Sequence, residues 1–135
     1  MNVLIDTNII LDVLCRREEF YVDAAKIFKL CEVKKISGYI SALSVPNIVY
    51  IMRKELDADK IKEIIEALSM IFIITDLKSE DLKKAVSMNF KDFEDAIQSA
   101  CALRIKADYI ITRNIKDFTE SKVAAIKPLE FLERI

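Results

Sequence analysis

The segment MNVLIDTNIILDVL, residues 1–14, joins a short apolar stretch to a helical pattern through three polar residues. Val3 to Ile5 is a continuous apolar run, which predicts a strand buried on both faces. Four apolar residues then recur at helical spacing, namely Ile9, Ile10, Val13 and Leu14. A buried strand followed at once by a helix is the repeating unit of a parallel α/β sheet.

The same alternation continues to the end of the chain. Further strands are expected at Gly38–Ser41, Ile71–Thr75, Tyr109–Thr112 and, weakly, Val123–Ile126. Helices are expected over Tyr21–Val33, about Val45–Lys54, Asp57–Ala67, from a Ser79 cap, over Asp92–Ile105 and from Pro128. No linker or repeat interrupts the pattern, so we predict a single α/β domain over residues 1–135, with a parallel sheet flanked by helices.

Composition limits the possible chemistry. The chain of 135 residues contains no histidine, which excludes imidazole as a base, acid or metal ligand. Its three cysteines are widely separated, so we expect buried free thiols rather than disulfides or a metal site. The longest apolar run, near Met70 to Ile74, is too short to cross a membrane, and the N-terminus does not resemble a signal peptide. These features predict a cytoplasmic protein without membrane contact.

Net charge gives no support to a nucleic-acid substrate, because the chain carries a formal charge of −1. Local basic groups remain candidates for phosphate contacts. From their positions alone we consider the arginines Arg16, Arg53 and Arg113.

Acids and amides follow the predicted strands or open the predicted helices. Asp6 follows the first strand, and Asn114 and Asp117 follow the fourth. Asp92, Glu94 and Asp95 lie together at one helix start. Each has an ordinary alternative explanation: Asp6 as a helix cap, Asp92 with Asp95 as a capping box, and the last pair as turn formers. A parallel sheet nevertheless brings strand ends and the following helix starts together.

Such a gathering of carboxylates predicts a bound cation. Two ionised carboxylates about 4 Å apart repel by roughly 4 kcal/mol at an effective dielectric constant of 20. A cation offsets this repulsion, and oxygen-only ligands favour Mg²⁺ or Mn²⁺. The residues themselves therefore predict a divalent-metal carboxylate site in an α/β domain.

Three motifs in this chain resemble those of PIN domains, including the VapC toxins of toxin–antitoxin pairs. They are LIDTNIILDVL (residues 4–14), DFEDAIQSACAL (92–103) and YIITRNIKDF (109–118), in the family's order and spacing. The resemblance covers nearly the whole chain. It implies a three-layer α/β/α fold with a central parallel sheet of four to five strands. It also implies Mg²⁺- or Mn²⁺-dependent ribonuclease activity on single-stranded RNA, an antitoxin partner and a homodimer.

The resemblance also implies roles for individual residues. Asp6 would be the first metal ligand, Asp95 the acid carried by a helix, and Asp117 with Asn114 the pair after the fourth strand. Asn8 and Thr112 would orient the carboxylates and water by hydrogen bonds.

The chain departs from the family at one position. PIN domains commonly carry a glutamate on the helix after the second strand, where ISALSVPNIVYI (residues 40–51) offers the neutral Asn47. Either Glu94 or Asp92 compensates from the neighbouring helix, or the site binds metal weakly and turns over slowly.

Two other functions are considered. In the first, the chain would be a PIN-like protein that binds RNA or a partner without cleavage. In the second, it would be a phospho-acceptor receiver domain with Asp76 as the acceptor. The receiver interpretation leaves the acids of residues 92–95 without a role.

Overall fold

The computed structural model describes residues 1–135, with five strands, seven α-helices and one 3-10 helix. The strands are β1 (Asn2–Ile5), β2 (Ser37–Ser41), β3 (Ile73–Thr75), β4 (Tyr109–Ile111) and β5 (Ala125–Ile126). The α-helices are α1 (Thr7–Leu14), α2 (Tyr21–Glu32), α3 (Ser44–Ile51), α4 (Ala58–Ile71), α5 (Ser79–Ser87), α6 (Phe93–Arg104) and α7 (Pro128–Arg134). The 3-10 helix η1 is Ile115–Phe118.

The five strands form one parallel sheet in the order β3-β2-β1-β4-β5. β1 is therefore central, and the chain builds outward from it in both directions. Ligands of such sheets bind at the carboxyl ends of the strands, at the point where the strand order reverses. Here that point lies between β1 and β4, where Ile5 pairs with Ile111.

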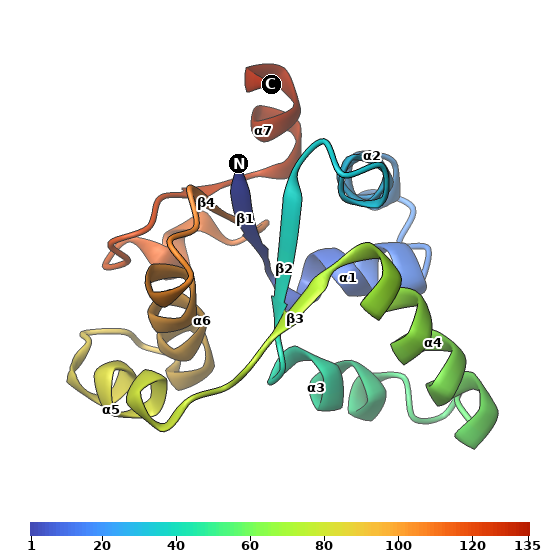
Figure 1. Cartoon of the computed structure of the whole chain (residues 1–135), viewed down its shortest axis with the longest axis horizontal. Coiled ribbons are helices and arrows are strands. Elements are labelled where there is room, and N and C mark those ends of the chain that lie inside the picture. The colour runs from blue at the N-terminus through green and yellow to red at the C-terminus, as the bar shows by residue number, and fades with distance from the viewer.

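Helices cover both faces of the sheet, as Figure 1 shows with α5 and α6 on one side and α1, α2 and α4 on the other. Alternate side chains of β1 enter two different cores, as the strand period of two requires. Val3 and Ile5 pack in the larger core, whereas Leu4 packs with Cys101 of α6 on the opposite face. The predicted three-layer α/β/α fold with a parallel sheet is confirmed.

Three predicted strands were too long, because β4 ends at Ile111 rather than Thr112, β5 begins at Ala125 rather than Val123, and β3 begins after Ile71. Ile71 belongs to α4, and β3 begins only at Ile73. Ile71 lies three residues after Leu68, so both can face the same core from one side of the helix. The apolar run of residues 70–74 is therefore shared between the end of a helix and a short strand.

Two helix boundaries also differ from the prediction. α3 ends at Ile51 rather than near Lys54. α5 begins at Ser79 itself, and the residue at its N-cap position is Lys78, so Ser79 does not cap it. The first turn is instead stabilised by Asp81, whose carboxylate accepts a hydrogen bond from the backbone N–H of Lys78 at 3.1 Å.

All three cysteines are free, but they are not all buried. Burial raises the pKa of Cys31 to about 12 and that of Cys101 to about 11, so both remain thiols. Cys15 is exposed because it lies at the C-cap of α1, beyond the part of that helix that faces the core. Among the helices, none is both long enough and apolar enough to span a bilayer.

Candidate active site

The parallel register places the residues after β1 and β4 side by side. The backbone N–H of Asp6 donates to the carbonyl oxygen of Ile111 at 3.0 Å, which extends the pairing by one residue. Asp6 and Thr112 are therefore neighbours at the carboxyl edge of the sheet, although 106 residues separate them.

The carboxylate of Asp6 points away from its helix. Asp6 lies at the N-cap position of α1, but its side chain makes no capping hydrogen bond. It accepts a hydrogen bond from the hydroxyl of Thr112 at 2.8 Å instead, and it is only 7% exposed. Burial raises the pKa of Asp6, and the hydrogen bond from Thr112 offsets only part of this effect.

The start of α6 supplies a second, half-buried acid. Asp92 caps this helix, and its carboxylate accepts a hydrogen bond from the backbone N–H of Asp95 at 3.1 Å. The side chain of Asp95 is free of that cap and half-buried. Burial first, and then the negative charges of Asp92, Asp6, Asp117 and Glu94, raise the pKa of Asp95 to about 7. Asp95 therefore lies in a negative field produced by four other carboxylates.

These acids open onto one cavity with a volume of about 250 Å³. Eight of the residues that the sequence analysis identified line it, namely Asp6, Asn8, Asn47, Asp92, Glu94, Asp95, Asn114 and Asp117. Thr112 stands behind the cavity and orients Asp6 through the bond described above. The acid and amide candidates thus lie in one place, as the sheet topology requires.

Asn47 lies within reach of Glu94. The amide of Asn47, on α3, donates to the Glu94 carboxylate at 3.3 Å. A carboxylate of α6 therefore lies in contact with the position at which PIN domains commonly carry a glutamate. This arrangement favours Glu94 over Asp92 as the compensating acid, because Asp92 is engaged in capping α6.

A buried polar chain beneath the cavity was missed by the sequence analysis. The hydroxyls of Thr7 and Ser44 lie 2.8 Å apart, and the amide of Gln98 donates to Ser44 at 3.1 Å. The other amide atom, Gln98 Oε1, is buried and has no hydrogen-bond partner. Gln98 also lines the cavity. Its position three residues after Asp95, and so on the same face of α6, is the signal that could have identified it.

The three arginines considered for phosphate binding lie outside this cavity. Arg113 forms a two-bond ion pair with Asp12, at 2.8 and 3.2 Å, and its guanidinium lies over the ring of Phe20. Arg16 and Arg53 lie over the tyrosine rings of Tyr21 and Tyr50. Arg113 is therefore held by structural contacts of its own.

The residues of this cavity fit a hard divalent cation. Every candidate ligand atom is an oxygen, and none of the cavity's acids forms an ion pair with Lys or Arg. The orphaned Gln98 Oε1 offers a further acceptor toward water held at the site. No three carboxylates converge on a single point. An ion bound by three of them therefore requires side-chain rotation, which the exposed Asp117 has room to make.

The parallel sheet flanked by helices and the acidic strand-end cavity agree with the family that the sequence motifs resemble. The chain belongs to the PIN-domain family, whose sequence model matches residues 2–116. No curated protein sequence matches the chain. The observed strand order, 3-2-1-4-5, also differs from the 2-1-3-4-5 order of receiver domains, which excludes that alternative.

Several solved structures share the fold. One is a chain of VapBC2 from Rickettsia felis in a complex with a DNA fragment from its promoter. It has a TM-score of 0.70 and 15% sequence identity, and the match covers 94% of this chain and 98% of that chain. A chain of a toxin–antitoxin complex from Klebsiella pneumoniae has a TM-score of 0.70 and 24% sequence identity, and the match covers 93% of this chain and 97% of that chain. A chain of FitAcB from Neisseria gonorrhoeae has a TM-score of 0.69 and 20% sequence identity, and the match covers 94% of this chain and 98% of that chain. At these identities the likeness establishes the fold.

Proposed function

We propose that this protein is an endoribonuclease that uses Mg²⁺ or Mn²⁺ to hydrolyse phosphodiester bonds of single-stranded RNA. The observation that carries the proposal is the one cavity that Asp6, Asp95 and Asp117 all line, none of them paired with a cationic side chain. Natural proteins rarely retain unpaired acids at such a cost unless the site has a function. Membership of the PIN-domain family supports the same reaction.

Asp6, Asp95 and Asp117 would hold the cation, with Asn114 and Glu94 as further oxygen ligands. When bound, a divalent cation polarises the phosphate and makes water more acidic. Thr112 fixes the direction of the Asp6 carboxylate through its 2.8 Å hydrogen bond. In the metal-free protein Asp95 has a pKa of about 7, so binding of the cation below neutral pH would displace its proton.

The biological setting is also a proposal. Because a chain of this fold occurs in a toxin–antitoxin complex, and the sequence motifs resemble those of VapC toxins, we infer that the chain is a VapC-like toxin with an antitoxin partner. We also infer that the protein acts in the cytoplasm as a homodimer.

Cleavage of a mixed pool of single-stranded RNA tests the proposed reaction. The purified protein is incubated with Mg²⁺, Mn²⁺ or EDTA, beside Asp6→Asn and a matched control, Asp59→Asn. Asp59 is an exposed acid of α4 outside the cavity, so its substitution makes the same chemical change elsewhere. We expect metal-dependent cleavage by the wild type and by Asp59→Asn, and a loss of at least about a hundredfold in Asp6→Asn.

The same experiment tests the second candidate function, which is a PIN domain that binds RNA or a partner without cleavage. The neutral Asn47 favours this candidate, because an amide contributes no charge to a metal site. If the folded wild type binds Mn²⁺ but cleaves RNA no faster than Asp6→Asn does, the proposed nuclease activity is rejected. The PIN domain that binds without cleavage is then the function that stands.

A further inference from the structure

A second cavity, of about 500 Å³, adjoins the carboxylate cavity and lies between the start of α6 and the segment around η1. It shares three residues with the first cavity, namely Asp92, Asp95 and Asp117. Its size falls within the range of small-molecule sites in proteins. A group bound here would lie directly beside the acids that we assign to phosphodiester cleavage.

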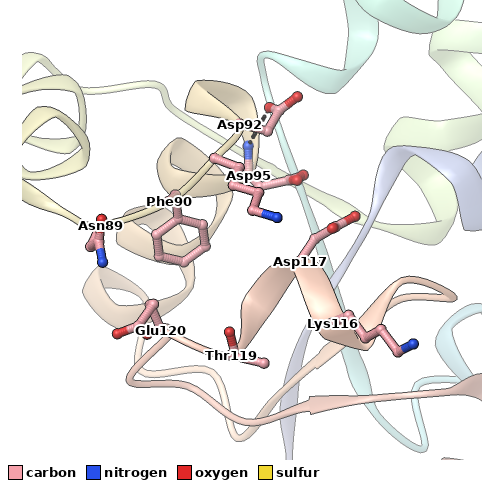
Figure 2. Close-up of a pocket in the computed structure, with 9 residues that line it drawn as sticks. Asn89, Phe90, Asp92, Asp95, Lys116, Asp117, Thr119 and Glu120 are labelled. Atoms are coloured by element: carbon pink, nitrogen blue, oxygen red, sulfur yellow. Dashed lines mark hydrogen bonds between the residues drawn. The ribbon is translucent and has the colours of Figure 1, made fainter.

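Phe90 is the one hydrophobic residue that lines this second cavity. Figure 2 shows its ring between Asn89 and Asp95, within the hollow that the labelled side chains surround. The ring is half-buried and packs edge-on against Phe118, with centroids 6.2 Å apart and an interplanar angle of 77°. Because core contacts fix the ring at one side, it presents a stable apolar surface to an otherwise polar cavity.

Polar groups of several kinds surround the ring. Asn89 supplies an amide, Thr119 a hydroxyl and Glu120 a carboxylate, while Lys91 and Lys116 add two ammonium groups. A nucleobase has the complementary chemistry, because it combines a flat face that stacks on aromatic rings with an edge of hydrogen-bond donors and acceptors. The lysines would lie near its phosphates.

We propose that this second cavity is a nucleobase subsite, in which a base next to the cleaved phosphodiester stacks on Phe90. The inference rests on the proposed ribonuclease function and deepens it, because it names where the enzyme contacts the base of its substrate. Stacking on an aromatic ring tolerates any base. Hydrogen bonds from the polar groups to the edge of the base would then impose the preference for one base over another.

Binding of RNA to a cleavage-blocked protein tests the subsite. In the Asp6→Asn background, fluorescence anisotropy gives the Kd for a single-stranded oligonucleotide whose cleaved bond has been mapped with the wild type. Abasic ribose then replaces each nucleotide in turn. Phe90→Leu removes the aromatic face but keeps an apolar side chain. Phe93→Leu is the matched control, because Phe93 lies in the same segment, is 50% exposed and does not line the cavity.

We expect one abasic position beside the cleaved bond to weaken binding about tenfold in Asp6→Asn. Phe90→Leu should weaken binding of intact RNA by a similar factor and should remove the effect of that abasic position, whereas Phe93→Leu should change neither. Equal binding of intact and abasic RNA at every position would overturn the subsite, as would equal behaviour of Phe90→Leu and Phe93→Leu.

The failures of the two proposals are distinguishable. If the wild type cleaves RNA and Asp6→Asn does not, but the abasic series shows no effect, the subsite fails and the nuclease stands. If the wild type neither binds nor cleaves RNA, both fail. Should Phe90→Leu not fold, the abasic series in Asp6→Asn alone still decides, because it leaves the chain unchanged at position 90.

Discussion

Two groups of buried or half-buried aspartates differ in their partners. Asp12 is fully buried in α1 and binds both Arg17 and Arg113. Asp81, 1% exposed in α5, forms a multiple-bond ion pair with Arg104. Asp6 and Asp95 at the carboxyl edge of the sheet have no such partner. The same residue type is thus neutralised in one region and left unpaired in the other.

The pKa of the paired Asp81 and the pKa values of the unpaired Asp6 and Asp95 move in opposite directions. Burial raises the pKa of Asp81, but the hydrogen bonds and charge of Arg104 outweigh it, so the net pKa is lowered. At Asp6 and Asp95 burial dominates and the pKa is raised. Paired acids hold helices in place, whereas unpaired acids destabilise the free protein and are suited to bind a cation.

The largest expected effect is the loss of stability on breaking a paired acid. Asp12→Asn should lower the free energy of unfolding by about 3 kcal/mol, because two guanidinium groups lose their buried counter-charge. Asp6→Asn should leave the unfolding midpoint unchanged or higher, because it removes one charge from a repelling cluster. Urea unfolding of both variants measures the contrast. A large loss in Asp6→Asn would contradict the assignment of Asp6 to the unpaired group.

The second prediction concerns pH. The pKa of Asp95 is about 7 in the folded protein against 3.8 in the unfolded chain, so the folded state binds its proton more tightly. Below about pH 4 Asp95 is protonated in both the folded and the unfolded state, so it does not affect the free energy of unfolding. As the pH rises from there to about 7, the free energy of unfolding falls. Because Asp95 is half-exposed, solvent screening reduces this loss to about 1–2 kcal/mol.

Urea unfolding from pH 4.5 to 8 in EDTA tests this slope. The free energy of unfolding of Asp95→Asn should depend less on pH over that range than that of the wild type. Asp59→Asn should show the same pH dependence as the wild type. Parallel curves for the wild type and Asp95→Asn would show that Asp95 titrates normally and is not under the influence of the cluster.

The smallest predicted effect is on the affinity for Mn²⁺ at the Asn47–Glu94 contact. Glu94→Gln should weaken Mn²⁺ binding about tenfold, because the site loses one of its charges. Asn47→Asp in the Glu94→Gln background should restore most of the affinity, since position 47 lies in hydrogen-bond contact with position 94. Unchanged affinity in Glu94→Gln, measured by Mn²⁺ titration, would remove Glu94 from the site.

The sequence was sufficient for the fold and for most of the acidic cavity. Apolar runs define the strands, and strand-end acids must meet when a sheet is parallel, so Asp6, Asp95 and Asp117 were predictable as a group. Side-chain pairing was less accessible, because it depends on rotamers and on helix placement. Asp12 resembled a polar residue of an amphipathic helix, and its bond to Arg113, 101 residues away, follows only from the packing.

The hydrogen-bond partners of Gln98 in the Gln98–Ser44–Thr7 chain, and the second cavity, lay beyond sequence reasoning for the same reason. Three ordinary polar residues on three helices form a buried hydrogen-bonded chain only once α1, α3 and α6 converge beneath the strand ends. Phe90 resembled a core residue, and only its position beside the acids indicates another role.

Calorimetric titration with Mn²⁺ near pH 6.5, in two buffers of different ionisation enthalpy, tests the central claim most directly. The unpaired acids should bind the ion and release about one proton, because Asp95 is still largely protonated at that pH. Asp95→Asn should lose the proton release and much of the affinity, and Asp59→Asn should keep both. Absence of binding to the wild type, or binding indifferent to Asp95→Asn, would contradict the claim that the unpaired acids form a cation site.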